Sequence, residues 1–332
     1  MAKRKIVHVG QMKSGTTFVQ NTLSQNRERL LKAQVLYPGK KINQQHACYG
    51  LCGQDIYWVR NAVGWQPLAT ALIDEVNGYD GDVIISCEAL SCMPEPGVQR
   101  FVEKLGSVDE VIITVRNLPS TILSAWQQHV KRGGQNSLSN FFERLQTTRE
   151  SSQGLWRNYS YGNTAKWWSP YGEVRFIVVE SFKREELPEI VLQAADVRRD
   201  SIAPVDLNAE QQNVSLMWED VEVLRRINAF ANGLAQEEKD AYLRFLLKNL
   251  LFPATQLGTG STILFPEKYL DLARQWAAEE TAKIPQSTTV YGDVDLLGSP
   301  EFVGSTPIDN PEVDIPERMN DLLYLWFKRF SR

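Results

Sequence analysis

The sequence predicts an α/β fold in which a central parallel sheet is flanked by helices. Short runs rich in Val and Ile alternate with amphipathic segments of helical length through about the first 185 residues, as in parallel α/β sheets. Several of these runs lead into a Gly or a charged residue, which suits the carboxyl ends of strands. From about Val214 the pattern is helical. We therefore expect one domain over residues 1–332, with an α/β core in 1–185 and a mainly helical and loop completion in 186–332.

The expected elements follow in chain order. Strands are expected near residues 4–9, 82–87, 110–115 and 174–179. Helices are expected near 16–33, 67–77, 97–106, 119–132, 137–146, 218–230, 242–251, 266–282 and 317–330. The remainder of 252–315 is rich in Gly, Pro, Ser and Thr and predicts long loops, and the polar stretch 43–54 predicts another loop.

Composition limits the classes of partner. The chain has 36 basic and 40 acidic side chains, so no overall charge attracts nucleic acid or an acidic membrane. The apolar run after Lys3–Lys5 breaks at Gly10, and no later run has the length of a membrane span. We expect a cytoplasmic protein with no nucleic-acid or membrane partner; a homo-oligomer is left open.

The four cysteines do not suggest a disulfide framework in a chain of 332 residues. His46, Cys48 and Cys52 have the spacing of half a zinc site, but no second half follows: Cys87 lies in a predicted strand and Cys92 just after it. We expect structural or free thiols and no metal site. His46 then stands in the predicted 43–54 loop either as a plain surface histidine or as a residue that binds a substrate or acts as a base.

The first chemical motif follows the first strand. That strand leads into Gly10 and then into the run Lys13, Ser14, Gly15, Thr16 and Thr17, where a helix begins. Backbone N–H groups, a helix N-terminus and one ammonium would surround a single point there, which suits an anion. The lysine precedes the second glycine, unlike in the Walker A loop of ATPases. The bland alternative is a helix cap at Ser14 or Thr16.

Two further strands end near polar residues. Arg116 follows the strand at 110–115, and Ser124 lies eight residues later on the next helix; a guanidinium and a hydroxyl in this order suit a terminal phosphate. Glu88 follows the strand at 82–87. In a parallel sheet Lys13, Glu88 and Arg116 would converge along one edge. A surface salt bridge for Arg116, an ordinary helix serine and a turn-capping glutamate are the alternatives.

These motifs resemble those of sulfotransferases that use 3′-phosphoadenosine 5′-phosphosulfate (PAPS). The run K-S-G-T-T after a strand resembles their 5′-phosphosulfate loop, and Arg116 with Ser124 is similar to their 3′-phosphate site. Glu88, in an S-x-E context, resembles the acidic base of the bacterial and carbohydrate-type branch. The resemblance covers about the first 185 residues and implies a P-loop-like sulfotransferase fold, PAPS as co-substrate, PAP as product and no metal.

The resemblance also implies roles for individual residues. Lys13 and Glu88 would be catalytic, and the cofactor-binding residues would be Lys13, Ser14, Gly15, Thr16, Thr17, Arg116 and Ser124. His46 is a further catalytic candidate from its position in the predicted 43–54 loop. His8 belongs to the same pattern, and we expect a core histidine bonded to backbone. Acceptor-pocket candidates are Tyr49, Tyr57, Trp58 and Trp65.

The implied reaction moves the sulfuryl group to a hydroxyl or amine of a small molecule, for example in secondary metabolism. A carbohydrate acceptor is the alternative within the family. A P-loop kinase and a nucleotide-binding module without catalysis are the alternatives outside it.

Overall fold

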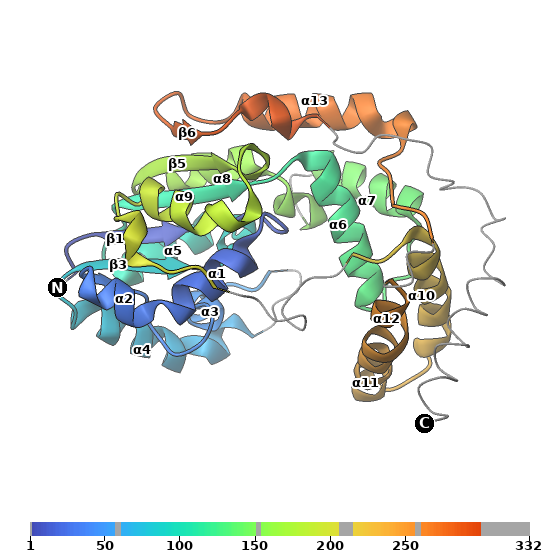
Figure 1. The fold of residues 1–332 in the computed structure, drawn as a ribbon, viewed down its shortest axis with the longest axis horizontal. Helices are drawn as coiled ribbons and strands as arrows, with labels where there is room; N and C mark the ends of the chain where they lie inside the picture. Colours follow the sequence, from blue (N-terminus) through green and yellow to red (C-terminus); the bar gives the residue numbers. More distant parts are fainter. Residues whose placement is uncertain (1, 57–60, 151–153, 206–214, 256–259, 300–332) are drawn as a thin grey trace. The chain divides into compact units, whose positions relative to one another are not determined.

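The computed structural model describes residues 2–56, 61–150, 154–205, 215–255 and 260–299 (Figure 1). The chain divides into two compact units. The first consists of Met1–Thr121, Thr148–Asp206 and Leu272–Ser299, and the second of Ile122–Thr147, Leu207–Asp271 and Pro300–Arg332. The expected single domain over residues 1–332 stays a prediction.

A six-stranded sheet forms the centre of the first unit. Its strands are β1 (Lys5–His8), β2 (Val35–Leu36), β3 (Asp82–Ser86), β4 (Glu110–Val115), β5 (Glu173–Val178) and β6 (Thr289–Tyr291). They lie in the order β2-β3-β1-β4-β5-β6, and every neighbouring pair is parallel. This confirms the parallel sheet predicted from the sequence. The segment that contains β6 was expected to form loops, and a run of three residues is too short to show a strand period.

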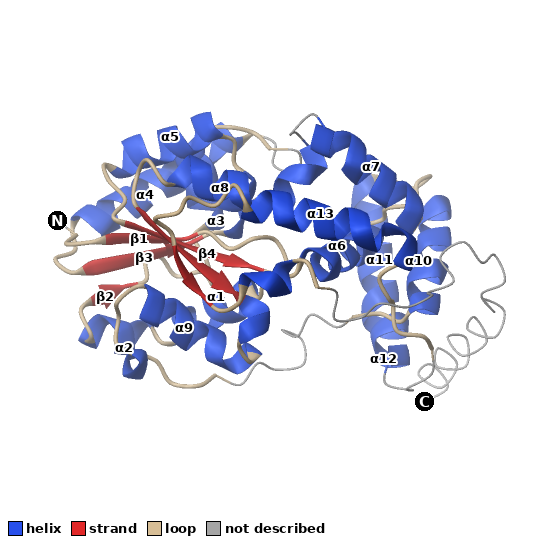
Figure 2. Cartoon of the chain, turned by 90° about the horizontal axis from the view of Figure 1, so that it is seen from above, coloured by secondary structure: helices blue, strands red, loops and turns tan. Residues whose placement is uncertain are grey.

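Both faces of the sheet are buried. Along β4, Val111 and Ile113 belong to one core and Ile112 to the other, because successive side chains of a strand point to opposite faces. In Figure 2, α3, α4, α5 and α8 lie on one side of the sheet and α1, α2 and α9 on the other. Their bounds are α1 (Thr16–Gln25), α2 (Arg27–Lys32), α3 (Gln45–Cys52), α4 (Gln66–Asn77), α5 (Glu95–Leu105), α8 (Tyr161–Trp168) and α9 (Leu187–Ala194). The flanking helices expected from the sequence are therefore confirmed.

The regular secondary structure in the described part of the second unit is mainly helical. This unit contains α10 (Trp218–Ala231), α11 (Gln236–Leu246) and α12 (Phe252–Thr255), while α6 (Leu118–Lys131), α7 (Leu138–Glu150) and α13 (Leu270–Thr281) each continue from one unit into the other. The helix expected at 218–230 is therefore present, and Trp218, Val221 and Leu224 on it are buried. The helix expected at 317–330 lies outside the described residues.

Two local expectations were wrong. The helix expected over 16–33 is interrupted at Asn26, whose side-chain amide donates to the carbonyls of Thr22 and Ala203. The predicted loop at 43–54 contains α3, because Cys48, Leu51 and Cys52 lie at helical spacing and are all buried. Gly53 ends that helix with a left-handed φ of 55°.

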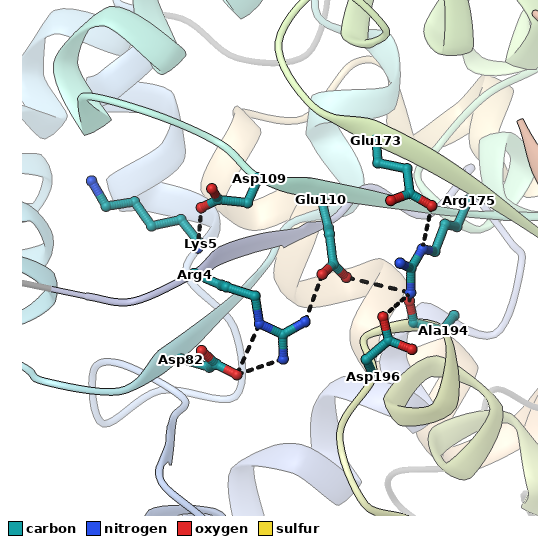
Figure 3. A network of polar contacts seen from close by, with 9 residues as sticks. All are labelled: Arg4, Lys5, Asp82, Asp109, Glu110, Glu173, Arg175, Ala194 and Asp196. Atoms are coloured by element: carbon teal, nitrogen blue, oxygen red, sulfur yellow. Dashed lines mark hydrogen bonds and ion pairs between the residues drawn. The ribbon is translucent and has the colours of Figure 1, made fainter. Parts of the chain in front are cut away.

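Charged side chains link the strands at their amino-terminal edge (Figure 3). Arg4 donates to Asp82 Oδ2 at 2.5 Å and to Glu110 Oε1 at 2.6 Å. Arg175 on β5 lies 3.6 Å from the other oxygen of Glu110 and 2.8 Å from Asp196. Burial raises the pKa of Glu110, and the two guanidinium groups oppose that shift. This network ties β1, β3, β4 and β5 together at the ends opposite the loops described next.

Candidate active site

The loop between β1 and α1 has the backbone of an anion site. Lys13 and Gly15 both have left-handed φ angles, of 71° and 80°. Helix α1 begins after Gly15 with no side-chain cap and with no acidic residue in its first turn. The first N–H groups of a helix have no partner within it and carry the positive end of its dipole. The β1–α1 loop can therefore bind an anion with backbone donors and the Lys13 ammonium.

Strand β4 holds this loop in place. The N–H of Gln11 donates to the carbonyl of Thr114 at 2.8 Å, and the Thr114 hydroxyl lies 2.9 Å from Ser14 Oγ. Ser14 Oγ also donates to the carbonyl of Gln11 at 2.7 Å, so this buried side chain serves the structure of the loop. A Cβ at Gly10 would lie 1.9 Å from Thr16 Cγ2, and only glycine fits there.

Glu88 lies against the first residue of α1. It follows β3, is partly buried, and accepts a hydrogen bond of 2.7 Å from Thr16 Oγ1 to its Oε2. Thr17, the next residue of the helix, is exposed. The structure thus brings a carboxylate from the end of β3 to the helix that begins at the β1–α1 loop.

Arg116 is joined to the same loop. Its backbone N–H donates to Gln11 Oε1 at 3.2 Å, and its Nε lies 3.4 Å from Glu180 Oε1. The same Glu180 oxygen accepts a hydrogen bond of 3.0 Å from the N–H of Asn117. Burial raises the pKa of Glu180, while Asn117 and Arg116 oppose that shift. Residues after β1 and β4 therefore meet at one edge of the sheet. Convergence of the Lys13, Glu88 and Arg116 side chains there stays a prediction.

His46 lies on α3 rather than in a loop. Its ring stacks on Trp65, with centroids 4.2 Å apart and an angle of 7° between the planes. Burial, and then the nearby Lys41, lower the pKa of His46. Of the other aromatic candidates, Tyr49 is buried and accepts a hydrogen bond from Gln45, and Tyr57 and Trp58 lie outside the described residues.

Ser124 lies on α6, in the part of that helix that belongs to the second unit, and it is partly buried. Its expected pairing with Arg116 stays a prediction.

Sequence reasoning missed Gln11, Glu180 and Thr114. It expected His8 to bond to backbone, whereas the ring contacts the hydroxyls of Ser86 at 2.8 Å and Thr114 at 3.2 Å. A signal was present, since His8, Ser86 and Thr114 are polar residues in three strand segments that are apolar apart from the charged residue that begins each. A buried polar side chain needs a hydrogen-bond partner, so three of them in neighbouring strands predict contacts with one another.

In the part of the chain that the structure describes, no group of three or more His, Cys, Asp or Glu side chains is arranged to hold a metal ion. Cys48, Cys52, Cys87 and Cys92 are buried free thiols. Within the same residues, no helix has both the length and the apolar character that crossing a membrane requires.

Comparisons with known proteins give one distant likeness. No family model matches the chain, and no curated protein matches it. Among solved structures, a sulfotransferase from Alicyclobacillus acidocaldarius is similar at 18% identity, with a TM-score of 0.40, over 64% of this chain and 89% of that one. A likeness this distant assigns no activity, so the function must be inferred from the residues of the site.

Proposed function

We propose that this chain is a PAPS-dependent sulfotransferase of the bacterial and carbohydrate-type branch. The proposal is carried by the 2.7 Å hydrogen bond from Thr16 Oγ1 to Glu88 Oε2, which holds a carboxylate against the helix behind the β1–α1 loop. A carboxylate at this position repels a bound anion, so a role in the reaction would account for its presence. Sulfuryl transfer supplies one, because the reaction needs a base beside the bound anion.

The residues present fit the nucleotide. Lys13 and the backbone N–H groups of Gly15, Thr16 and Thr17 would hold the 5′-phosphosulfate, as cation and N–H donors do for anions. Ser14 would contribute by shaping the loop, because its N–H donates to the Gln11 carbonyl at 3.1 Å. Among the described residues the buried Gln11 Nε2 has no hydrogen-bond partner, so this loop has a donor to spare for an acceptor-rich ligand.

The second phosphate would be held after β4. Arg116 would bind the 3′-phosphate, with Ser124 donating one further hydrogen bond. The link from Gln11 to Arg116 supports both sites serving one nucleotide, because it joins the β1–α1 loop to the residue after β4.

The chain's own groups would perform the transfer. When bound, PAPS supplies the sulfuryl group and a phosphate leaving group. Glu88 accepts the proton of the acceptor hydroxyl or amine as the acceptor bonds to sulfur. Lys13 and the N-terminal N–H groups of α1 stabilise the negative charge that develops on the leaving oxygen. The Thr16 hydroxyl holds Glu88 in one orientation, which favours transfer by positioning.

We propose a small-molecule hydroxyl or amine, of the kind found in secondary metabolism, with a carbohydrate as the alternative acceptor. His46, stacked on Trp65, would bind the acceptor or act as a second base, since its lowered pKa favours the neutral ring. A cytoplasmic location and possible homo-oligomerisation belong to the same proposal.

Two alternatives remain distinguishable by experiment. A P-loop kinase would require Mg²⁺ and a nucleoside triphosphate. A nucleotide-binding module without catalysis would bind PAP and would not depend on Glu88 for any reaction. Calorimetric titration of PAP with and without Mg²⁺, followed by a transfer assay from PAPS to a panel of acceptors, separates the three.

The decisive variant is Glu88→Gln. The amide oxygen can still accept from Thr16, but the group no longer takes a proton, so transfer should fall about 10²- to 10⁴-fold while PAP affinity is kept. Glu95→Gln, at the exposed first turn of α5, is the matched control. An unchanged rate in Glu88→Gln would remove Glu88 as the base.

Lys13→Ala tests the other half of the reaction. Loss of the ammonium should lower transfer by about 10²- to 10³-fold, as removal of one transition-state donor does. Lys3→Ala, at an exposed lysine before β1, should leave the rate unchanged. Wild-type transfer in Lys13→Ala would contradict the proposed role of the loop.

A further inference from the structure

A buried chain of polar contacts lies beneath the β1–α1 loop. On one side of the His8 ring, Gln20 Nε2 lies 3.1 Å from Ser86 Oγ, and Ser86 Oγ lies 2.8 Å from His8 Nδ1. On the other side, His8 Nε2 lies 3.2 Å from Thr114 Oγ1, and Thr114 Oγ1 lies 2.9 Å from Ser14 Oγ. Ser14 Oγ lies 2.7 Å from the Gln11 carbonyl oxygen. Every residue in this series is at most 2% exposed. Bulk water therefore does not substitute for any of these contacts, and each hydroxyl or ring proton must be donated to another group of this hydrogen-bond series.

The position of each proton can be assigned in turn, starting from the hydrogen bond between Ser14 and Gln11 in the loop. The Ser14 hydroxyl has one hydrogen and donates it to the Gln11 carbonyl. The contact between Ser14 Oγ and Thr114 Oγ1 must then use the hydrogen of Thr114. Because the Thr114 hydroxyl has no second hydrogen, it accepts from His8, and His8 Nε2 carries the proton.

The other end of the chain agrees with this assignment. Burial keeps His8 neutral by lowering its pKa to about 4, so the ring has a single N–H. The bare Nδ1 then accepts from the Ser86 hydroxyl, whose oxygen accepts from Gln20. The opposite tautomer would leave the 2.9 Å contact between Ser14 and Thr114 with no hydrogen between two oxygens.

We propose that His8, as the Nε2–H tautomer, is a positioning residue for the β1–α1 loop. It orients the Thr114 hydroxyl, which holds Ser14 and the turn from Gln11 to Ser14. That turn contains Lys13 in its left-handed conformation, which is unfavourable for a residue with a side chain and persists only where its surroundings enforce it. The inference rests on the proposed function in that the anion bound by the loop is the phosphosulfate end of the nucleotide.

The contacts distinguish positioning from plain packing. An apolar side chain in place of His8 would fill the core equally well, but it would leave the Ser86 hydroxyl without its acceptor and the Thr114 hydroxyl without its donor. The consequence reaches the loop through one hydroxyl, that of Thr114. The proposal can therefore be tested at Thr114 without changing any residue assigned to bind the nucleotide.

The test compares Thr114→Val with Thr114→Ser. Valine keeps the size of threonine and removes the hydroxyl, whereas serine keeps the hydroxyl. By calorimetry, at a temperature where circular dichroism shows both variants folded, Thr114→Val should bind PAP at least about tenfold more weakly than wild type, and Thr114→Ser within about threefold of it. Equal PAP affinity in Thr114→Val and wild type overturns the proposal and leaves the proposed function standing.

A second measurement needs no nucleotide. In ¹⁵N NMR of the ligand-free protein, His8 should show a protonated Nε2 and a bare Nδ1 at neutral pH; with three histidines in the chain, His8→Gln assigns the signals. A protonated Nδ1 overturns the proposal. If wild type fails to bind PAP, the proposed function fails, and the same pair of Thr114 variants is compared with inorganic sulfate as the probe.

Discussion

The side-chain oxygen of Gln11 accepts a hydrogen bond of 3.2 Å from the backbone N–H of Arg116. This bond joins the loop that follows β1 to the residue that follows β4. Strands β1 and β4 are neighbours in the sheet. Two proposed phosphate sites are thereby coupled through one glutamine. Arg116 keeps this backbone link whatever its side chain is, so its substitution tests the guanidinium alone.

Arg116→Ala should weaken binding of PAP by about 10- to 100-fold, as loss of a charged hydrogen-bond donor does. Adenosine 5′-phosphate, which lacks the 3′-phosphate, should lose much less, and the ratio of the two affinities is the measurement. Arg198→Ala, at an exposed arginine paired with Asp200, serves as the control. Equal losses for both nucleotides would place the 3′-phosphate elsewhere. Ser124→Ala should reduce the same ratio by a smaller factor.

Gly10→Ala should disrupt the loop itself. The added methyl would lie 1.9 Å from Thr16 Cγ2 and 2.7 Å from Thr114 Oγ1, so the first turn of α1 must move. We expect a loss of about 1 to 3 kcal/mol in the free energy of unfolding, together with weaker PAP binding. In Gly298→Ala the nearest atom to the new methyl is at 3.4 Å, so denaturant unfolding of that variant should match wild type. Unchanged stability in Gly10→Ala would contradict the close packing.

The sequence predicted the frame of the site well, because its signals are local. Val and Ile runs mark β1, β3, β4 and β5, and parallel pairing brings their carboxyl ends to one edge. For Thr16 and Glu88, the sequence predicted only that they lie at the same edge of the sheet, without the hydrogen bond between them. Its geometry depends on how the short helical turn that begins at Glu88 leaves β3, which no local pattern encodes.

The supporting residues were not predicted because their function depends on partners far along the chain. Gln11 is one polar residue in a loop, and its role appears only when Arg116, 105 residues later, lies beside it. Likewise Glu180 follows β5 and acts on Arg116 and Asn117 across the sheet edge. The π-stacked pair His46 and Trp65 required α3, which the polar composition of residues 43–54 concealed.

Glu110→Gln should destabilise the fold without affecting nucleotide binding. Glu110 is 6% exposed and lies between Arg4 and Arg175 at the sheet edge opposite the site. An amide has one oxygen for the two guanidinium contacts and would turn its NH2 donor toward the other guanidinium, at a cost of about 1 to 3 kcal/mol. Glu103→Gln, exposed on α5, should lie within about 0.5 kcal/mol of wild type in urea unfolding. A large loss of PAP affinity in Glu110→Gln would contradict the separation of the two edges.

His8 should make the protein less stable in mild acid. Burial lowers its pKa from 6.5 to about 4, so between these values the unfolded chain binds a proton that the folded chain does not. The contribution of His8 to the free energy of unfolding is therefore complete above pH 6.5, falls as the pH is lowered, and is lost below about 4, a total of about 3 kcal/mol.

Urea unfolding of wild type and His8→Gln from pH 7.5 to about 4.5 isolates this contribution, because the other ionisable groups are common to both. The wild-type curve should fall more steeply by close to one bound proton near pH 5. Parallel curves would mean that His8 is protonated within the folded protein, and the Nε2–H donor chain beneath the loop would then be wrong.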